Sequence, residues 1–187
     1  IVVVSGIILG FFHKPVIAEI RIDDIITDYK GEKTFLGPSP PPSAEEIVEK
    51  LEELDERDDV VAVVVYIDSP GGEIIPSREI YDTLRSMNKP TVAYLRGSAV
   101  SGGYMVACGT DYIISEPETI TGSIGVRATM VSLEGLFSKL GINYTTLKSG
   151  DLKDIGDVGH DLTPEERAIL EGIINDFNRK FIHIVKE

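Results

Sequence analysis

The sequence predicts an α/β domain with a mainly parallel sheet flanked by helices. Two observations support this class: segments with strand and helix patterns alternate along the chain, and a glycine-rich turn follows each of two consecutive strands. Residues 60–68 (VVAVVVYID) are apolar and β-branched, as in strands covered on both faces. Because the carboxyl ends of parallel strands meet at one edge of a sheet, both glycine turns are expected there, where ligand sites gather.

The first third of the chain predicts a strand, a loop and a helix. Apolar and polar residues alternate over residues 18–23, which is typical of a half-buried strand. Residues 37–43 (GPSPPPS) exclude helix and central strand, so we expect a surface loop long enough to form a lid. Ser43 and Glu46 match a capping box and predict the start of a helix.

The middle of the chain repeats the order strand, glycine turn, helix. The SPGG turn at residues 69–72 precedes a helix predicted for residues 75–87. A strand at residues 91–97 leads into a short apolar helix at residues 104–108, and residues 112–115 predict a further strand. This series is the basis for the parallel sheet.

The last third predicts a short helix over residues 131–140, with Gly141 as its C-cap, and a strand over residues 143–148. A glycine-rich loop follows, and Thr163 with Pro164 begins the final helix. The apolar stripe of that helix is expected to pack on the core or on another subunit. It consists of Ile169, Leu170, Ile173, Ile174, Phe177, Phe181 and Ile184.

Composition restricts the classes of partner. The chain has 187 residues, of which 42% are hydrophobic, enough for one domain with a substantial core. Its net charge of −13 argues against a nucleic-acid surface and against attraction to anionic lipid. Cys108 is the only cysteine, which rules out an internal disulfide and is best interpreted as a buried thiol.

Residues 1–14 begin with an uncharged apolar run over residues 1–12 (IVVVSGIILGFF). A membrane helix needs about 20 apolar residues, so this run is too short to span a bilayer by itself. It is either the distal end of a membrane anchor or a buried first strand. Residues 15–187 are expected to form a single domain.

Ser101 lies in the glycine-rich stretch GSAVSGGYMVACG, at the predicted start of a helix. The unpaired amides of a first helical turn favour negative charge beside the serine oxygen. A nucleophilic serine needs such an exposed hydroxyl on a tight turn with backbone donors nearby. The alternative interpretation is a plain N-cap.

A nucleophilic serine also needs a base. Among the three histidines, His13 and His183 lie near the termini, which leaves His160 for a histidine-based triad. Lysine is the other possibility, with Lys148 and Lys153 as candidates. Lowering a lysine pKa from about 10.4 to about 7–8 requires roughly 4 kcal/mol of desolvation or like-charge repulsion.

Four motifs, in order, resemble those of the signal peptide peptidase A family of Ser–Lys proteases. They are DSPGG at residues 68–72, GSAVSGGY at 97–104, TGSIG at 121–125 and KSGDLKD at 148–154. The resemblance spans residues 60 to about 166. It implies a fold similar to the Clp protease subunit and to crotonase, with repeated ββα or βαβ units, and it makes residues 15–187 the protease catalytic domain.

The resemblance also implies a role for each matching residue. Ser101 matches the nucleophile, Lys153 the general base and Ser123 the hydroxyl that orients that lysine. The amides of Gly72 and Gly102 match the oxyanion hole. No metal or other cofactor is implied.

The remaining polar residues in these motifs are expected to play no chemical part. Lys148 is interpreted as a solvated strand end, and Asp154 is expected to face away from Lys153 because it would otherwise raise the pKa of the base. Ser69, Ser98 and Ser149 are interpreted as turn residues. Met105 stands where the family often has an aromatic residue, which affects the shape of the pocket.

Family members are held in the cell membrane by a single N-terminal helix, with the catalytic domain on the extracytoplasmic side. The resemblance therefore implies that the apolar N-terminus is an anchor remnant. It also implies a homo-oligomeric ring, in which serine and lysine of neighbouring subunits meet, and substrates that are signal peptides or short unfolded peptides.

Two other functions fit part of this pattern. A crotonase-type acyl-CoA enzyme or binding protein shares the glycine amides but does not require Ser101. An inactive assembly domain would tolerate Ser101→Ala. A cytosolic Clp-type protease would need a histidine shortly after the serine, and none stands there.

Overall fold

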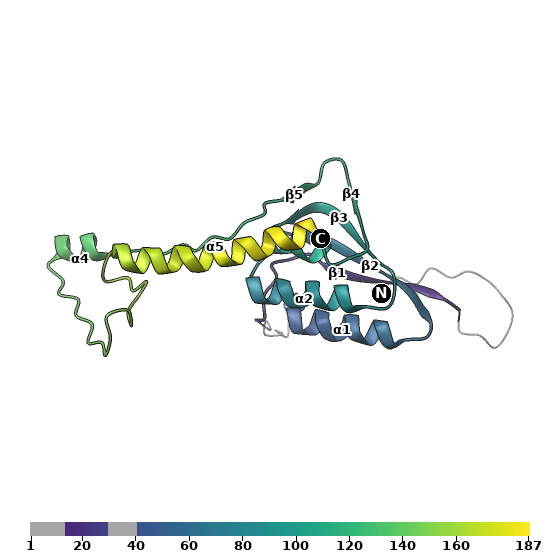
Figure 1. Ribbon diagram of the computed structural model, residues 1–187, viewed down its shortest axis with the longest axis horizontal. Helices are drawn as coiled ribbons and strands as arrows, with labels where there is room; N and C mark the ends of the chain where they lie inside the picture. Colours follow the sequence, from purple (N-terminus) through teal and green to yellow (C-terminus); the bar gives the residue numbers. More distant parts are fainter. Residues whose placement is uncertain (1–13, 30–40) are drawn as a thin grey trace, which may run out of the picture. The chain divides into compact units, whose positions relative to one another are not determined.

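The computed structural model describes residues 14–29 and 41–187, which divide into two compact units (Figure 1). The first unit takes in the described residues up to Ile124 together with Ile184–Glu187, and the second is Gly125–His183. The apolar run at residues 1–12 lies outside the described residues, as does most of the expected lid at residues 37–43.

The first unit is built on a five-stranded sheet in which every strand pairing is parallel. Its main path runs in the order β1 (Val16–Ile22), β2 (Val60–Ser69), β3 (Thr91–Val100) and β4 (Tyr112–Ser115). A fifth strand, β5 (Ile120–Gly122), also pairs with β3. The α/β class with a parallel sheet and flanking helices is confirmed.

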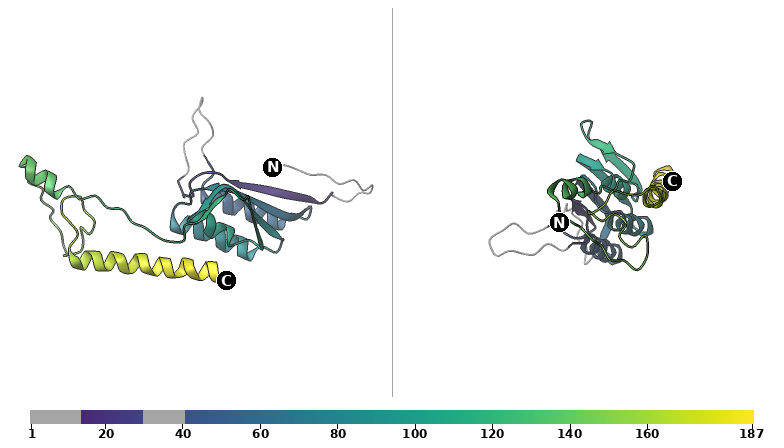
Figure 2. Two further views of the ribbon diagram at one scale, coloured as in Figure 1. Left: turned by 90° about the horizontal axis from the view of Figure 1, so that it is seen from above. Right: turned by 90° about the vertical axis from the view of Figure 1, so that its left-hand side faces the viewer.

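Helices α1 (Ala44–Glu56) and α2 (Ile74–Ser86) lie side by side against this sheet (Figures 1 and 2). The capping box at the start of α1 is confirmed: the Glu46 amide donates to Ser43 Oγ, and the Ser43 amide donates to the Glu46 carboxylate at 2.9 Å. Such caps satisfy amides that the first helical turn leaves unpaired.

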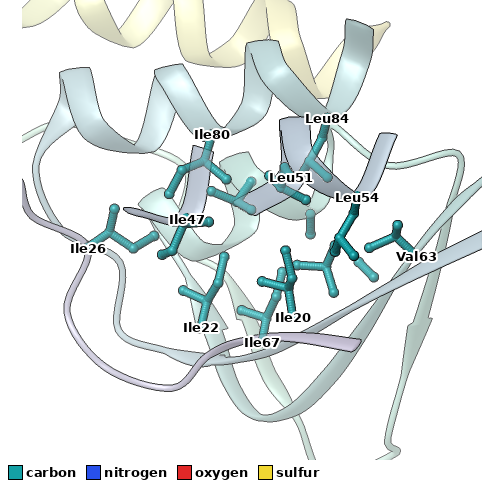
Figure 3. Close-up of a cluster of buried hydrophobic side chains, with 14 of the residues drawn as sticks. Ile20, Ile22, Ile26, Ile47, Leu51, Leu54, Val63, Ile67, Ile80 and Leu84 are labelled. Carbon is teal, nitrogen blue, oxygen red and sulfur yellow. The ribbon is translucent and has the colours of Figure 1, made fainter. Parts of the chain in front are cut away.

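One continuous core joins the two helices to the sheet (Figure 3). Leu51 of α1 and Ile80 of α2 are fully buried against strand residues such as Ile67. Each such side chain contributes about 1.5–3 kcal/mol of burial free energy. This core holds the strands rigidly, and with them the turns at their carboxyl ends.

The sequence predicts that both faces of β2 are covered, but the sheet face opposite the helices is partly exposed. Val61 is 48% exposed, and alternate residues along β2 are only half-buried. The reason is that α1 and α2 contact only one face. On the other, Tyr66 and Tyr94 meet edge to face, and the Arg21 guanidinium lies 3.7 Å from the centre of the Tyr66 ring.

Helix α3 (Gly102–Ala107) follows β3 directly and packs on α2. Its Met105, Val106 and Ala107 are buried, in line with the apolar helix expected here. Cys108, which ends α3, is half-buried, and this burial raises the pKa of its thiol. An unreactive, protonated thiol follows.

The second unit contains α4 (Glu134–Leu140) and most of α5 (Pro164–Lys186). Gly141 ends α4 in the left-handed region, with φ of 65°, as a C-cap glycine does. The strand predicted for residues 143–148 is wrong. No described strand lies beside this segment to pair with it, and Tyr144 instead stacks on Phe137.

The apolar stripe of α5 is unevenly covered. Phe181 and Ile184 are buried, whereas Ile169 and Ile173 are 39% and 48% exposed. Burial of the stripe is therefore seen only near the end of the helix, and contact of its other residues with the core or with another subunit stays a prediction. Across residues 14–29 and 41–187, no helix combines the length and the apolar character that crossing a membrane requires.

Candidate functional site

Three neighbouring parallel strands end together at one edge of the sheet. Ser69 of β2 is the register partner of Ala99 in β3, and Ala99 is the partner of Thr121 in β5. The Thr121 hydroxyl reinforces this alignment by donating to the Ala99 carbonyl at 2.9 Å. The residues that follow these partners in the chain therefore lie at the same edge of the sheet.

Gly71, Ser101 and Ser123 each lie two positions after one of these three partners. The Ser101 amide donates to the Gly122 carbonyl at 2.9 Å, which ties the β3 end to the β5 end. The structure therefore brings Ser101, Ser123 and the glycine turn together. Strand order had predicted only that Ser101 and the glycine turn would lie close together.

Ser101 and Ser123 share an unusual backbone conformation. Their φ angles are 53° and 52°, and among the described residues they are the only non-glycine residues with positive φ. Such a conformation costs on the order of 1–3 kcal/mol and persists only where surrounding contacts impose it. Strained turns between a strand and a helix are the usual place for a nucleophilic serine.

The plain N-cap interpretation of Ser101 does not fit the structure. Ser101 precedes α3, but its side chain makes no capping hydrogen bond to that helix. An N-cap serine would direct its oxygen to an amide of the first turn. Among the described residues, the half-buried Ser101 hydroxyl has no hydrogen-bond partner and is available for chemistry.

The amides of Gly72 and Gly102 are two unused donors beside Ser101. Gly102 is the first residue of α3, so its N–H has no acceptor within the helix, and the Gly72 amide has no hydrogen-bond partner among the described residues. A Cβ atom added to Gly102 would lie 3.2 Å from the Gly72 nitrogen. The two donors are thus close together, as an oxyanion hole requires.

Glycine is required at position 71 for two reasons. Its φ is +88°, and a Cβ atom there would lie 2.6 Å from the Gly102 nitrogen and 2.7 Å from the Val100 oxygen. The glycine turn therefore packs directly against the Ser101 turn, with no room for a side chain between them.

Ser69 supports the glycine turn and is a residue that the sequence analysis missed. It is the fully buried last residue of β2 and not a turn residue as expected. Its hydroxyl donates to the Asp24 carbonyl at 2.6 Å and accepts the Gly71 amide at 3.0 Å. Ser98 was also expected in a turn, but it lies within β3.

The chain segment around Ile26 holds the other side of the same turn. The Ile26 amide donates to the Gly71 carbonyl at 2.9 Å, and the Glu73 amide donates to the Ile26 carbonyl at 2.8 Å. The Glu73 carboxylate in turn accepts the Thr27 hydroxyl at 3.0 Å. Both neighbours of Gly72 are therefore bonded, while its own amide stays available.

Lys153 lies in the second unit, whereas Ser101 lies in the first, so their pairing stays a prediction. Lys153 is exposed and has no ion pair or side-chain hydrogen bond with any of residues 14–29 and 41–187. Lys148 differs: its ammonium donates to Asp154 Oδ1 at 2.7 Å, which raises the Lys148 pKa. A lysine held protonated in this way is a poor base, which favours Lys153.

His160, the alternative base, is also in the second unit and is engaged there. Its Nδ1 lies 2.9 Å from the Asp161 carbonyl oxygen and its Nε2 lies 3.3 Å from that of Asp154. The contact with the Asp161 carbonyl raises the His160 pKa. Neither ring nitrogen is left free to accept a proton from a serine.

Comparison with known proteins identifies the family of the chain. The family model described as peptidase family S49 matches residues 83–187, more than half of the chain, and the Clp protease model matches residues 25–120. Both matched stretches contain the β3 turn with Ser101.

Three individual relatives carry the names of proteases or peptidases. A protein of Methanocaldococcus jannaschii with a provisional protease name is 37% identical over 98% of this chain and 60% of its own length. A protein of Enterococcus faecium, provisionally named signal peptide peptidase SppA, is 34% identical over 73% of this chain and 40% of its own. The chloroplastic serine protease SPPA of Arabidopsis thaliana is 33% identical over 83% of this chain and 23% of its own. The chain thus spans at most 60% of each.

Gly71→Ala is expected to destabilise the first unit. The alanine Cβ would clash with the Gly102 amide and the Val100 carbonyl. Alanine would also have to adopt a positive φ, and such backbone strain alone costs about 1–3 kcal/mol. Urea denaturation followed by circular dichroism measures the loss. Gly125→Ala is the matched control, because that glycine has open space and no positive φ, and should change stability by less than about 0.5 kcal/mol. Equal effects of the two variants would contradict the packing described for Gly71.

Proposed function

The chain belongs to peptidase family S49, and on that premise we propose that it is a serine endopeptidase with Ser101 as nucleophile and Lys153 as general base. The observation that carries this proposal is the strained Ser101 turn, whose free hydroxyl lies beside the two unused glycine amides. A serine that only capped a helix would need neither the strain nor the free donors.

The proposed reaction is acyl transfer. Neutral Lys153 takes the Ser101 proton while the serine oxygen attacks a peptide carbonyl. The amides of Gly72 and Gly102 bind the resulting oxyanion, and loss of one such donor typically costs about 10²–10³ in rate. Lys153 then protonates the leaving amine and afterwards activates the water that releases the acyl group.

Ser123 is proposed to orient the Lys153 amine through its hydroxyl. Its position level with Ser101 and its matching positive φ support this role. A hydroxyl accepts a hydrogen bond from an ammonium and donates one to a neutral amine, so it can hold the lysine in both protonation states.

A homo-oligomeric ring is part of the proposal. Lys153 is exposed, whereas a lysine must be desolvated or placed near another cation to act as a base at moderate pH. A neighbouring subunit that covers Lys153 and brings Ser101 to it would supply this desolvation. The exposed apolar residues Ile169 and Ile173 of α5 would suit such an interface.

The proposed substrates are signal peptides left in the membrane and other short unfolded peptides. The name of the Enterococcus faecium relative supports the first class. We further propose that residues 1–14 belong to an anchor that places residues 15–187 outside the cytoplasm.

Ser101→Ala and Lys153→Ala are each expected to lower kcat for a fluorogenic peptide by about 10³-fold or more, with KM little changed. Activity of the parent should rise from about pH 6 to about pH 10, since only the neutral lysine is a base. Ser115→Ala and Lys139→Ala are the controls, because both residues are exposed and lie outside the four motifs. Full activity of Lys153→Ala would refute the base assignment, and an inert parent that binds CoA esters would favour the acyl-CoA alternative.

Mixed assemblies test whether neighbouring subunits share the dyad. Inactive Ser101→Ala and Lys153→Ala chains, unfolded and refolded together, are expected to regain partial activity because some interfaces would join an intact serine to an intact lysine. The readout is peptide hydrolysis against each variant refolded alone. Absence of any recovery in mixed rings, isolated through a different affinity tag on each variant, would place both residues in one subunit.

Membrane association is expected to depend on the apolar N-terminus. A chain starting at residue 15 should stay in the supernatant after ultracentrifugation, whereas the full-length natural protein should sediment with membranes. Sedimentation of both to the same extent would contradict the anchor.

A further inference from the structure

The residue that follows Lys153, Asp154, is the centre of a group of charged side chains within the second unit. Its carboxylate is only 8% exposed. Lys148 Nζ donates to Asp154 Oδ1 at 2.7 Å, and His160 Nε2 lies 3.6 Å from Asp154 Oδ2. Lys148, Asp154, His160 and Glu166 are called the Asp154 cluster below.

The contacts of His160 favour the protonated form of its ring. Nδ1 faces the Asp161 carbonyl oxygen at 2.9 Å, and Nε2 faces the Asp154 carbonyl oxygen at 3.3 Å. Carbonyl oxygens only accept, and a neutral imidazole carries a single N–H. Both contacts are satisfied together only when the ring is doubly protonated. The buried Glu166 carboxylate, 4.0 Å from Nδ1, adds a second negative neighbour to this cation.

A bound metal ion is the competing explanation for this group. One ligand atom from each of Asp154, His160 and Glu166 lies within 4.8 Å of the others. The His160 nitrogens are directed at carbonyl oxygens, however, and Lys148 places an ammonium against Asp154. Glu166 accepts the Thr163 amide at 2.8 Å as part of the α5 cap. A metal would have to displace all three interactions.

The backbone around Lys153 is a series of tight turns attached to this cluster. The Lys153 amide donates to the Gly150 carbonyl at 3.1 Å, and the Asp157 amide donates to the Asp154 carbonyl at 2.9 Å. Lys148 also donates to the Asp151 carbonyl at 2.9 Å. Both the side chain and the carbonyl of Asp154 are therefore anchored, whereas the Lys153 side chain has no hydrogen bond or ion pair in the part of the chain that the structure describes.

We propose that Asp154 is the positioning residue of Lys153: Lys148 and the protonated His160 hold its carboxylate, which fixes the turn at residues 150–156 on the start of α5. The role rests on the proposed function of Lys153 as the base. The same contacts keep the Asp154 carboxylate away from the lysine whose amine must lose a proton, an arrangement that the sequence analysis expected without knowing its cause.

The cluster has a defined pH dependence. The hydrogen bond from Lys148 lowers the Asp154 pKa, so the stabilisation by Asp154 is present above its ordinary pKa and is lost as pH falls through the lowered value. The His160 pKa is raised, so its contribution is complete below about 6.5 and is lost as pH rises through the raised value. The other charged side chains that line the same hollow as His160 are Lys148, Glu134, Asp151, Asp161, Glu165 and Glu166.

Hydrogen–deuterium exchange of peptides covering residues 149–157 tests the cluster independently of catalysis. Asp154→Asn should speed exchange several-fold at both about pH 6 and about pH 9, after correction for intrinsic rates. His160→Gln should speed it at about pH 6 and have a smaller effect at about pH 9, because the parent ring loses its charge as pH rises through the raised pKa. Asp151→Asn is the matched control, since it removes the same charge from an exposed carboxylate in the same segment.

Three exchange results would overturn the proposal. They are parent-like exchange in Asp154→Asn, a His160→Gln effect that is equal at both pH values, and an Asp151→Asn effect as large as that of Asp154→Asn. Slower exchange of the parent, but not of His160→Gln, on addition of zinc chloride would identify a metal site and also overturn it.

Peptide hydrolysis then tests the positioning role. In an enzyme whose activity requires Lys153, Asp154→Asn should lower kcat by about 10-fold to 100-fold with KM unchanged, and Asp151→Asn should not. Unchanged kcat in Asp154→Asn would overturn the positioning role. If the parent shows no activity that depends on Lys153, the proposed function fails by itself, and the exchange result alone decides the structure of the cluster.

Discussion

The register of three parallel strands is the constraint on which the rest of the first unit depends. Pairing of Ser69 with Ala99, and of Ala99 with Thr121, makes β2, β3 and β5 end level with one another. The turns that follow then have to share one small space, and the buried core beneath α1 and α2 prevents the strands from sliding to relieve the crowding. Glycine in the first turn and positive φ in the two serine turns are consequences of that crowding.

The same crowding shapes the site at which we propose that Ser101 reacts. Strain of about 1–3 kcal/mol at a serine is tolerable because the hydrogen bonds of the neighbouring turns and the core offset it. Ser69 is fully buried and bonds the Gly71 amide and the Asp24 carbonyl, so the turn cannot rotate to pair the Gly72 amide elsewhere. Donors that are fixed before the substrate arrives need no reorganisation when the oxyanion forms. The second unit also has a turn that is fixed by hydrogen bonds, since bonds to Asp154 hold the turn that carries Lys153.

Local sequence patterns predicted those parts of the fold that depend on local interactions. Alternating strand and helix segments, the Ser43 capping box and the Gly141 cap follow from neighbours in the chain and are confirmed. Long-range contacts were missed. Nothing near Ser69 in the sequence indicates that Asp24, 45 positions away, accepts its hydroxyl. The strand expected at residues 143–148 had the right composition but no described neighbour to pair with, and β5 is three residues long and was hidden in a turn-rich passage.

The most direct test of the account is to label the assembled natural protein with a fluorophosphonate and identify the modified residue by peptide mapping. Fluorophosphonates react with serines whose nucleophile and oxyanion donors are already in place. The account predicts a single adduct on Ser101 that disappears in Ser101→Ala and persists in Ser98→Ala. An adduct on another serine, or continued peptide hydrolysis by a protein in which Ser101 is absent, would contradict the assignment of this turn as the catalytic centre.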